Sequence, residues 1–262
     1  MHKWFSKFVL IAGLAAIWAL AVNPARAQSG DEKEKSPVYT YVAEWGVSRG
    51  DWPAYEKANA GTKQIMDKLM ADGTIVGYGW FKNLVHQEGS PTHGEWWSAT
   101  SMGNLMKALA VISGQTGANA DAQTKILTAS KHWDYVLVSR QYGVHSGTFE
   151  NAYLRVGSYK GKRGEGETQE KAIKSYIVPT LEKLLADGSI HFYSVDREAI
   201  HSDDPADFDI VVITNGAEGL DKFFAALEAA GKANPTGGPA FGSATDGSAH
   251  RDSLSLTTAV FK

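Results

Sequence analysis

The segment Lys68-Leu-Met-Ala-Asp-Gly-Thr-Ile75 recurs 115 residues later as Lys183-Leu-Leu-Ala-Asp-Gly-Ser-Ile190. Two shorter matches follow in the same order: Val85-His86 with Ile200-His201, and His132-Trp-Asp134 with His250-Arg-Asp252. The last of these has an offset of 118 residues. Matches that keep their order while the offset grows slowly indicate an internal duplication with short loop insertions. The sequence therefore predicts two related structural units.

Each copy has the residue pattern of a strand, a helix, two strands, a second helix and a final strand. In the first copy we expect strands at 38–47, 75–85, 95–99 and 135–142, and helices at 51–73 and 102–112. In the second copy we expect strands at 152–159, 190–195, 208–214 and 253–261, and helices at 168–186 and 220–227. Pro179 should kink or restart its helix, because proline has no backbone N–H to donate. The stretch 234–247, rich in Gly, Pro, Ser and Thr, predicts a flexible loop.

A duplicated β-α-β-β-α-β unit resembles the ferredoxin-like fold, and specifically the dimeric α/β-barrel superfamily. The resemblance rests on topology and repetition, extends over residues 37–262 and identifies no member family. It implies an α+β protein with an antiparallel sheet in each half and the helices outside. The two units are then expected to pack sheet to sheet as a pseudo-dimeric α/β barrel with a cavity between the sheets.

The N-terminal 27 residues have the features of a secretory signal. A basic start precedes an apolar run from Phe8 to Val22 and the small-residue sequence Ala25-Arg-Ala27. We expect cleavage near Ala27 and export to the periplasm or the extracellular space; an uncleaved anchor helix is the alternative. The domain boundaries then follow: a disordered leader at 28–36, the first repeat at 37–143, a linker at 144–149 and the second repeat at 150–262.

Composition limits the partners of this chain. It has 26 Lys and Arg against 29 Asp and Glu, a net charge of −3, and no cysteine. Residues 1–27 hold three of the basic residues and no acidic one, so the chain that remains after cleavage has a net charge of −6. Such a protein is a poor match for nucleic acid, whose phosphates require clustered cations. No later apolar run reaches the roughly 18 residues of a membrane span, so no transmembrane anchor is expected after cleavage. A monomer is adequate, since both halves share one chain, although exposed strand edges could still associate into a homo-oligomer.

Several histidines are candidate metal or cofactor ligands: His86, His93, His132, His201 and His250. The topology brings the end of the second strand and the start of the fourth to one end of each sheet. These strands are opposite edges of a four-stranded sheet, so three spacings of ~4.8 Å separate His86 from His132 by roughly 14 Å, too far to share one metal ion. A local cluster of His86, Glu88, His93 and Glu95 is a second arrangement. The alternative is that the histidines brace turns and strand entries by hydrogen bonding.

Tryptophan is concentrated in the first copy, and the second copy has none. Adjacent Trp96 and Trp97 must point to opposite faces of their strand, so one of them faces the cavity. An aromatic-walled cavity suits a flat apolar ligand, whereas core packing between the sheets is the alternative. The candidate ligand-binding residues are Trp45, Trp80, Trp96, Trp97, Trp133 and, in the loop at that end, Arg49.

The sequence contains no GxSxG nucleophile elbow, no phosphate-binding Walker loop and no CxxC pair. We therefore predict an exported protein that binds a small apolar or aromatic molecule, or a partner, without catalysis. The alternative is a haem- or metal-dependent oxidoreductase or monooxygenase of the barrel superfamily, with one of the histidines as base or proximal ligand. The residues alone identify no catalytic group, cofactor, ligand or oligomeric state.

The signal prediction can be tested directly on the secreted protein. Its N-terminal sequence should begin at or near Gln28, because the small residues Ala25 and Ala27 fit the cleavage site. Replacing both alanines by Trp should block processing. Recovery of exported protein that still begins at Met1 would contradict cleavage and favour an anchor helix.

Overall fold

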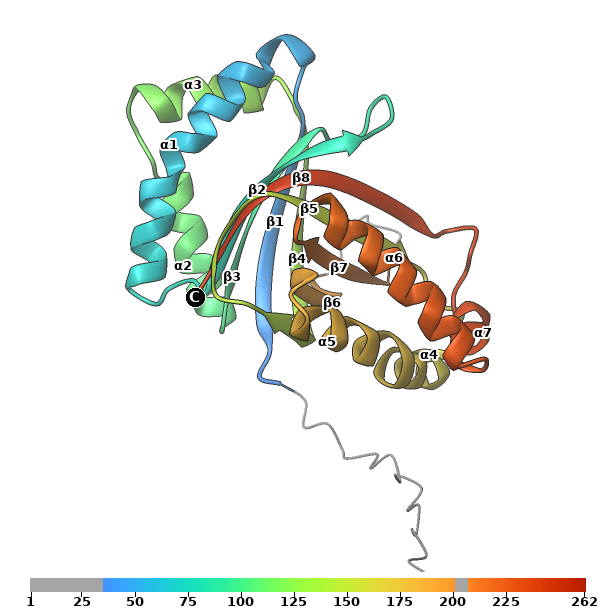
Figure 1. The fold of residues 1–262 in the computed structure, drawn as a ribbon. Helices are drawn as coiled ribbons and strands as arrows, with labels where there is room; N and C mark the ends of the chain where they lie inside the picture. Colours follow the sequence, from blue (N-terminus) through green and yellow to red (C-terminus); the bar gives the residue numbers. More distant parts are fainter. Residues whose placement is uncertain (1–34, 201–206) are drawn as a thin grey trace, which may run out of the picture. The chain divides into compact units, whose positions relative to one another are not determined.

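The computed structural model describes residues 35–200 and 207–262. Within these residues, eight antiparallel strands close into a barrel in the order β1-β3-β2-β8-β5-β7-β6-β4 (Figure 1). The strands are β1 Val38–Gly46, β2 Gly77–Val85, β3 His93–Ala99, β4 Lys131–Val144, β5 Gly147–Tyr159, β6 Ile190–Ile200, β7 Phe208–Thr214 and β8 Arg251–Phe261.

The helices lie outside the barrel in two groups, which Figure 1 shows on opposite sides. The first group consists of α1 Trp52–Ala71, α2 Met102–Ser113 and α3 Ala118–Thr128. The second consists of α4 Gly166–Ala172, α5 Val178–Ala186, α6 Gly216–Ala233 and α7 Gly237–Ala244. A 3-10 turn at Arg49–Asp51 precedes α1, and a π-helical turn at Ile173–Ile177 separates α4 from α5. None of the described helices has both the length and the hydropathy needed to cross a membrane.

The strand order confirms the predicted duplication of a ferredoxin-like unit. The first half has the order β4-β1-β3-β2 and the second half the equivalent order β8-β5-β7-β6. Two seams, β2 with β8 and β4 with β6, join the halves by hydrogen bonds. Because both edges of each half are paired, the described part of the chain presents none of the exposed sheet edges that a homo-oligomer could have used.

The two faces of the barrel wall carry separate cores. The interior holds an apolar cluster that includes Phe81, Trp96 and Phe261, while Trp97 packs on the outer face beneath the helices. Trp96 and Trp97 thus lie on opposite faces, as their adjacency in a strand predicted.

Several elements differ from the sequence prediction. Residues 234–247 are not a loop throughout, because α7 lies within them; Asn234 Oδ1 accepts a hydrogen bond from Gly237 N at 2.9 Å, and Phe241 packs on Tyr159 at 5.1 Å. The helix α3 was not predicted, since among its residues only Ile126 and Leu127 pack against a buried cluster. Pro179 lies in the first turn of α5, so the helix restarts there as expected.

Part of the prediction falls outside the described residues. The signal at 1–27, most of the leader at 28–36, and His201 are in this group. Of the leader, Lys35 and Ser36 are described; the Lys35 ammonium donates a hydrogen bond to the Tyr142 carbonyl oxygen. The segment predicted as the linker, 144–149, contains the end of β4 and the start of β5.

The seam between β2 and β8 offers a test of barrel closure. A Cβ added at Gly79 would lie 2.6 Å from the Thr258 carbonyl oxygen, whereas one added at Gly50 would meet nothing within 4 Å. We expect Gly79→Ala to lower the free energy of unfolding by about 1–3 kcal/mol and Gly50→Ala to change it by less than about 0.5 kcal/mol. Denaturant titration measures both. Equal effects of the two substitutions would contradict the close approach of β2 and β8.

Candidate functional site

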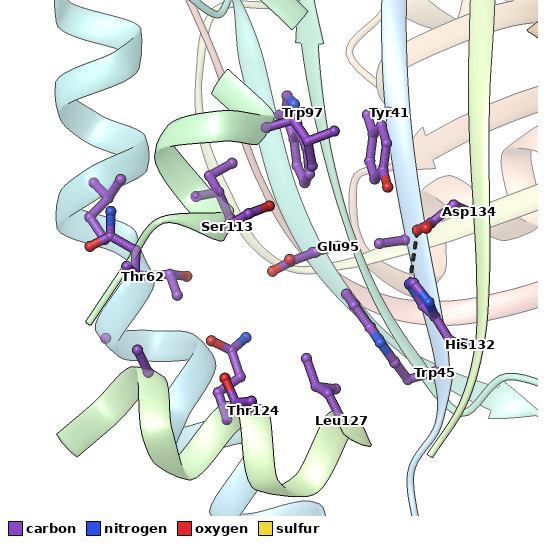
Figure 2. Close-up of a pocket in the computed structure, with 18 of the residues that line it drawn as sticks. Tyr41, Trp45, Thr62, Glu95, Trp97, Ser113, Thr124, Leu127, His132 and Asp134 are labelled. Carbon is purple, nitrogen blue, oxygen red and sulfur yellow. Dashed lines mark ion pairs between the residues drawn. The ribbon is translucent and has the colours of Figure 1, made fainter. Parts of the chain in front are cut away.

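Two hollows lie against the barrel wall. One is the barrel interior, with a volume of about 690 Å³, and the other, of about 400 Å³, lies between the outer face of the first half and the helices α1, α2 and α3. We call the second the helix–sheet pocket (Figure 2). Its sheet side is formed by Tyr41, Ala43, Trp45, Glu95, Trp97, His132 and Asp134.

Strand register places two carboxylates on the floor of this pocket. Ala43 of β1 is the direct partner of both Glu95 on β3 and Asp134 on β4. Directly opposed residues share a face, and two strand spacings put the Glu95 and Asp134 backbones about 10 Å apart. Because only the Ala43 methyl group stands between them, the sheet surface is hollow at this point.

Aromatic stacks border the hollow on both sides. One residue row away, Tyr41 and Trp97 are stacked with ring centroids 4.6 Å apart and planes 14° apart. In the row on the other side, Trp45 and His132 are stacked at 5.3 Å and 10°. Figure 2 shows the Glu95 side chain between these stacks, pointing from the sheet toward the helices.

Glu95 is the chemically unusual group. Its side chain is 6 % exposed, and none of the described residues forms a hydrogen bond with its carboxyl group. Burial, together with the negative charge of Asp134, raises the pKa of Glu95 to about 7. A carboxyl group that titrates near neutral pH can either accept or release a proton, as a general base or acid requires.

Asp134 connects the pocket floor to the solvent. Its Oδ1 lies 2.9 Å from His132 Nε2, and the His132 side chain is 46 % exposed. Burial, together with the Asp134 carboxylate, raises the pKa of Tyr41 well above its usual value. Tyr41 therefore stays protonated at physiological pH.

The helix side of the pocket is polar but uncharged. Hydroxyl and amide groups come from Thr62 of α1, Ser113 of α2, and Gln123 and Thr124 of α3. Gln123 Nε2 also donates a hydrogen bond to Asn59 Oδ1 at 2.8 Å, which ties α3 to α1. The remaining surface is apolar, from Ile65, Leu109, Ile112 and Leu127. A ligand here would meet aromatic rings on one side and neutral hydrogen-bonding groups on the other.

In the second half, other side chains occupy the positions that correspond to the floor of this pocket. Gly157 is the direct partner of Ile210 and Asp252, so Ile210 stands where the first half has Glu95. Arg155 takes the place of Tyr41, forms an ion pair with Asp252 and lies over Gly157, where an added Cβ would be 2.7 Å from its Nη1. Ile210 is buried in a continuous apolar cluster.

The barrel interior is larger, but its most deeply buried carboxylate is already satisfied. Asp196 accepts hydrogen bonds from Ser139 and, at 3.0 Å, from Ser194. Burial nevertheless raises the pKa of Asp196 to about 6. Asn83 and Ser255 also pair with each other, at 2.5 Å. These polar groups hold neighbouring strands together, whereas Glu95 has no comparable role.

The predicted ligand-binding residues separate into three groups. Trp45 and Trp97 line the helix–sheet pocket, and Trp96 and Trp133 line the barrel interior. Trp80 packs edge-on against Tyr78 at 5.3 Å and lines neither hollow. Arg49 also lines neither and sits over the Trp52 ring at 5.2 Å. Strand alternation divides these side chains between two faces of the barrel wall, and ligand binding by any of them stays a prediction.

The described histidines do not form one site. His132 lines the helix–sheet pocket and His86 the rim of the barrel interior. His93 is buried between Thr92 Oγ1 at 3.0 Å and Glu56 Oε1 at 3.4 Å. His250 stacks on Tyr159 at 4.3 Å. In the described part of the chain no group of three or more His, Asp or Glu side chains could hold a metal ion, so the expected hairpin cluster of His86, Glu88, His93 and Glu95 is wrong.

The residues of the helix–sheet pocket also do not fit a haem group. Axial ligation would require a histidine whose imidazole extends into the pocket. His132 instead lies flat against Trp45, and its Nε2 is engaged by Asp134. This pocket therefore offers no set of ligands for the haem group or metal ion that the oxidoreductase alternative included.

No protein-family model and no curated protein sequence matches the chain. Solved structures do share its fold. A "putative monooxygenase" from Lactobacillus acidophilus NCFM is 12% identical, with 87% of this chain and 97% of that one covered and a TM-score of 0.60. A "putative monooxygenase" from Fusobacterium nucleatum is 8% identical, with 87% and 95% covered and a TM-score of 0.61. Chlorite dismutase from Candidatus Nitrospira defluvii, in complex with imidazole, is 10% identical, with 84% and 90% covered and a TM-score of 0.50.

These similarities show that the chain has the fold of the dimeric α/β-barrel superfamily, as the repeat implied; they identify no member family. They also correct the functional prediction. We expected a protein that binds a ligand without catalysis, but the matched structures are named as enzymes of oxidation chemistry. The names of these structures favour the oxidoreductase alternative over the prediction of binding without catalysis.

The raised pKa of Glu95 predicts a specific dependence of stability on pH. Unfolding returns this pKa from about 7 to an ordinary value, so between these values the folded state binds more protons and stability falls as pH rises. At pH 8 the ionisation of Glu95 lowers the free energy of unfolding by about 3 kcal/mol. Glu95→Gln should therefore stabilise the protein strongly at pH 8 and little near pH 4.5, as denaturant titrations at several pH values would show. A stability difference that does not vary with pH would contradict the burial of an ionisable Glu95.

Proposed function

We propose that this protein is an oxidoreductase that acts on a flat aromatic substrate in the helix–sheet pocket, with Glu95 as its general base. One observation carries the proposal: the buried Glu95 carboxyl group faces the pocket without a hydrogen-bond partner among the described residues, and its pKa is raised to about 7. A structural carboxylate would be paired, because burying an unpaired polar group costs stability. An unpaired one that titrates near neutral pH is suited to proton transfer.

The shape of the pocket supports a planar substrate. A volume of about 400 Å³ is within the ordinary range of small-molecule sites. The Tyr41–Trp97 and Trp45–His132 stacks present flat surfaces on both sides of Glu95. Thr62, Gln123 and the other neutral polar groups of the helices can hydrogen-bond to hydroxyl or carbonyl oxygens of such a substrate.

The chemistry follows from the position of the base. Glu95 removes a proton from a phenol or from a CH2 group acidified by a conjugated aromatic carbonyl. The resulting anion is rich in electrons and can be oxidised by dioxygen, so that CH2 and O2 become C=O and H2O. For a phenol, the two hydrogens of the water come from the hydroxyl group and from the ring carbon that becomes the new C=O of a quinone. One oxygen atom thus enters the substrate and the other leaves as water. The names of the two structures at TM-scores of 0.60 and 0.61 support monooxygenation as the reaction type.

We also propose that the enzyme works outside the cytoplasm, in the periplasm or beyond the cell. The signal-like residues 1–27 support export. The absence of cysteine removes any dependence on disulfide formation in that compartment. The acidic mature chain remains a poor match for nucleic acid.

Substitution of the base tests the proposed reaction. Glu95→Gln keeps the size of the side chain but cannot accept the proton, so we expect kcat to fall by about 10²–10⁴-fold. Anthrone, whose CH2 group lies opposite the ketone in the central ring and is acidified through the two flanking aromatic rings, and 1-naphthol are suitable probes. Oxygen uptake measures turnover, and quenching of tryptophan fluorescence measures binding, which should be retained because Trp45 and Trp97 line the pocket.

The matched control is Asp196→Asn. It also converts a buried carboxyl group to an amide, but in the barrel interior, so oxygen uptake should change by less than about twofold if the variant is folded. Full activity of Glu95→Gln would overturn the assignment of the base. So would a result in which both variants still bind the substrate but only Asp196→Asn abolishes turnover.

A further inference from the structure

We propose that His132 is a positioning residue which, through Asp134, controls whether Glu95 is ionised. The use of this control in catalysis rests on the proposed function. The electrostatic coupling itself does not, because it depends only on the arrangement of three side chains on the first half of the barrel.

The three side chains form a short line from the buried base to the solvent. Glu95 and Asp134 flank Ala43 in one residue row of the sheet, with no bulky group between them. Asp134 Oδ1 is 2.9 Å from His132 Nε2. Glu95 is 6 % exposed, whereas the side chain of His132 is 46 % exposed. His132 is therefore open to the solvent, while Glu95 lies enclosed beside the charge of Asp134.

The charge of His132 determines how much net negative charge lies beside Glu95. When His132 is protonated, its positive charge compensates Asp134 and the pair is neutral. When His132 is neutral, the negative charge of Asp134 remains and disfavours a second negative charge on Glu95. Protonation of His132 should thus favour ionised Glu95, which extends the range in which the base can act toward lower pH.

The other groups around Glu95 do not offer an alternative cation. On the sheet, the direct partners of Glu95 are Ala43 and Trp80, which carry no charge. Tyr41, one row away, stays protonated. On α1, Tyr55 is held neutral by burial and by the charge of Glu95. The pocket-lining residues of α1, α2 and α3 are all uncharged. One row away, His93 is paired with Glu56 at 3.4 Å.

The second half shows the same pair without this sensitivity. His250 Nε2 lies 3.2 Å from Asp252 Oδ2, but Asp252 also pairs with Arg155, whose charge is permanent. Ile210 replaces Glu95 there. Only in the first half, within the described residues, does a buried carboxyl group lie beside an aspartate whose compensating charge depends on a histidine.

The ionisation of Glu95 can be followed without any substrate. A protonated buried carboxyl group gives an infrared C=O band whose loss with rising pH reports its midpoint, and Glu95→Gln identifies the band. His132→Gln removes the compensating charge and should raise the midpoint by at least about half a pH unit. Asp134→Asn removes the negative charge and should lower it by a similar amount.

A second substitution at the same position separates charge from structural damage. His132→Lys places a fixed positive charge there and should lower the midpoint, opposite to His132→Gln. The matched control is His250→Gln, which removes the equivalent histidine of the second half and should leave the midpoint unchanged. Midpoints that stay fixed in all His132 and Asp134 variants, or that move in the same direction in His132→Gln and His132→Lys, would overturn the proposal.

The two proposals fail in different ways. If the midpoints move as expected but neither anthrone nor 1-naphthol supports oxygen uptake that depends on Glu95, the coupling stands and the proposed reaction on these substrates fails. If Glu95→Gln abolishes oxygen uptake while the midpoints do not respond to His132, the reaction stands and the role of His132 is wrong.

Discussion

Hydrogen bonding along the two seams of the barrel is the constraint on which the rest of this structure depends. The pairs β2 with β8 and β4 with β6 join two four-stranded sheets into one closed wall. Closure buries one face of every strand inside the barrel and leaves the other face to be covered by helices. It also fixes which residues form rows across the wall, so Glu95, Ala43 and Asp134 line up on the outer face of the first half. A protein without cysteine relies on this burial for its stability.

The comparison of the two halves shows how a duplicated scaffold can acquire a site. The second half has Arg155, Gly157 and Ile210 at the positions of Tyr41, Ala43 and Glu95, and these residues complete an apolar core crossed by one ion pair. The first half leaves the corresponding space open. It keeps a carboxyl group there at a cost in stability, since desolvation raises the pKa of Glu95 to about 7. A cost of this kind is expected where a residue serves function rather than folding.

The fold could be predicted from the sequence because two similar segments, Lys68 to Ile75 and Lys183 to Ile190, indicate the duplication directly. Pro179 and the adjacent Trp96 and Trp97 were also placed correctly, since proline geometry and strand alternation are local rules. The pocket could not be predicted in the same way. In the sequence, Glu95 resembles any polar residue of a strand with alternating polarity. Only the strand register shows that it shares a row with Ala43 and Asp134. The functional prediction was wrong because it inferred the absence of catalysis from the absence of motifs. Catalysis by a single desolvated carboxyl group, as we propose for Glu95, requires no motif.

We propose that substrate binds on the outer face of the first half, against Glu95, and not inside the barrel. A crystal structure of the protein with anthrone tests it most directly. We expect the ligand to lie between the Tyr41–Trp97 and Trp45–His132 stacks, with its CH2 group about 3–3.5 Å from a Glu95 carboxyl oxygen, a near-attack distance. A ligand found in the barrel interior, beside Trp96 and Trp133, would contradict it.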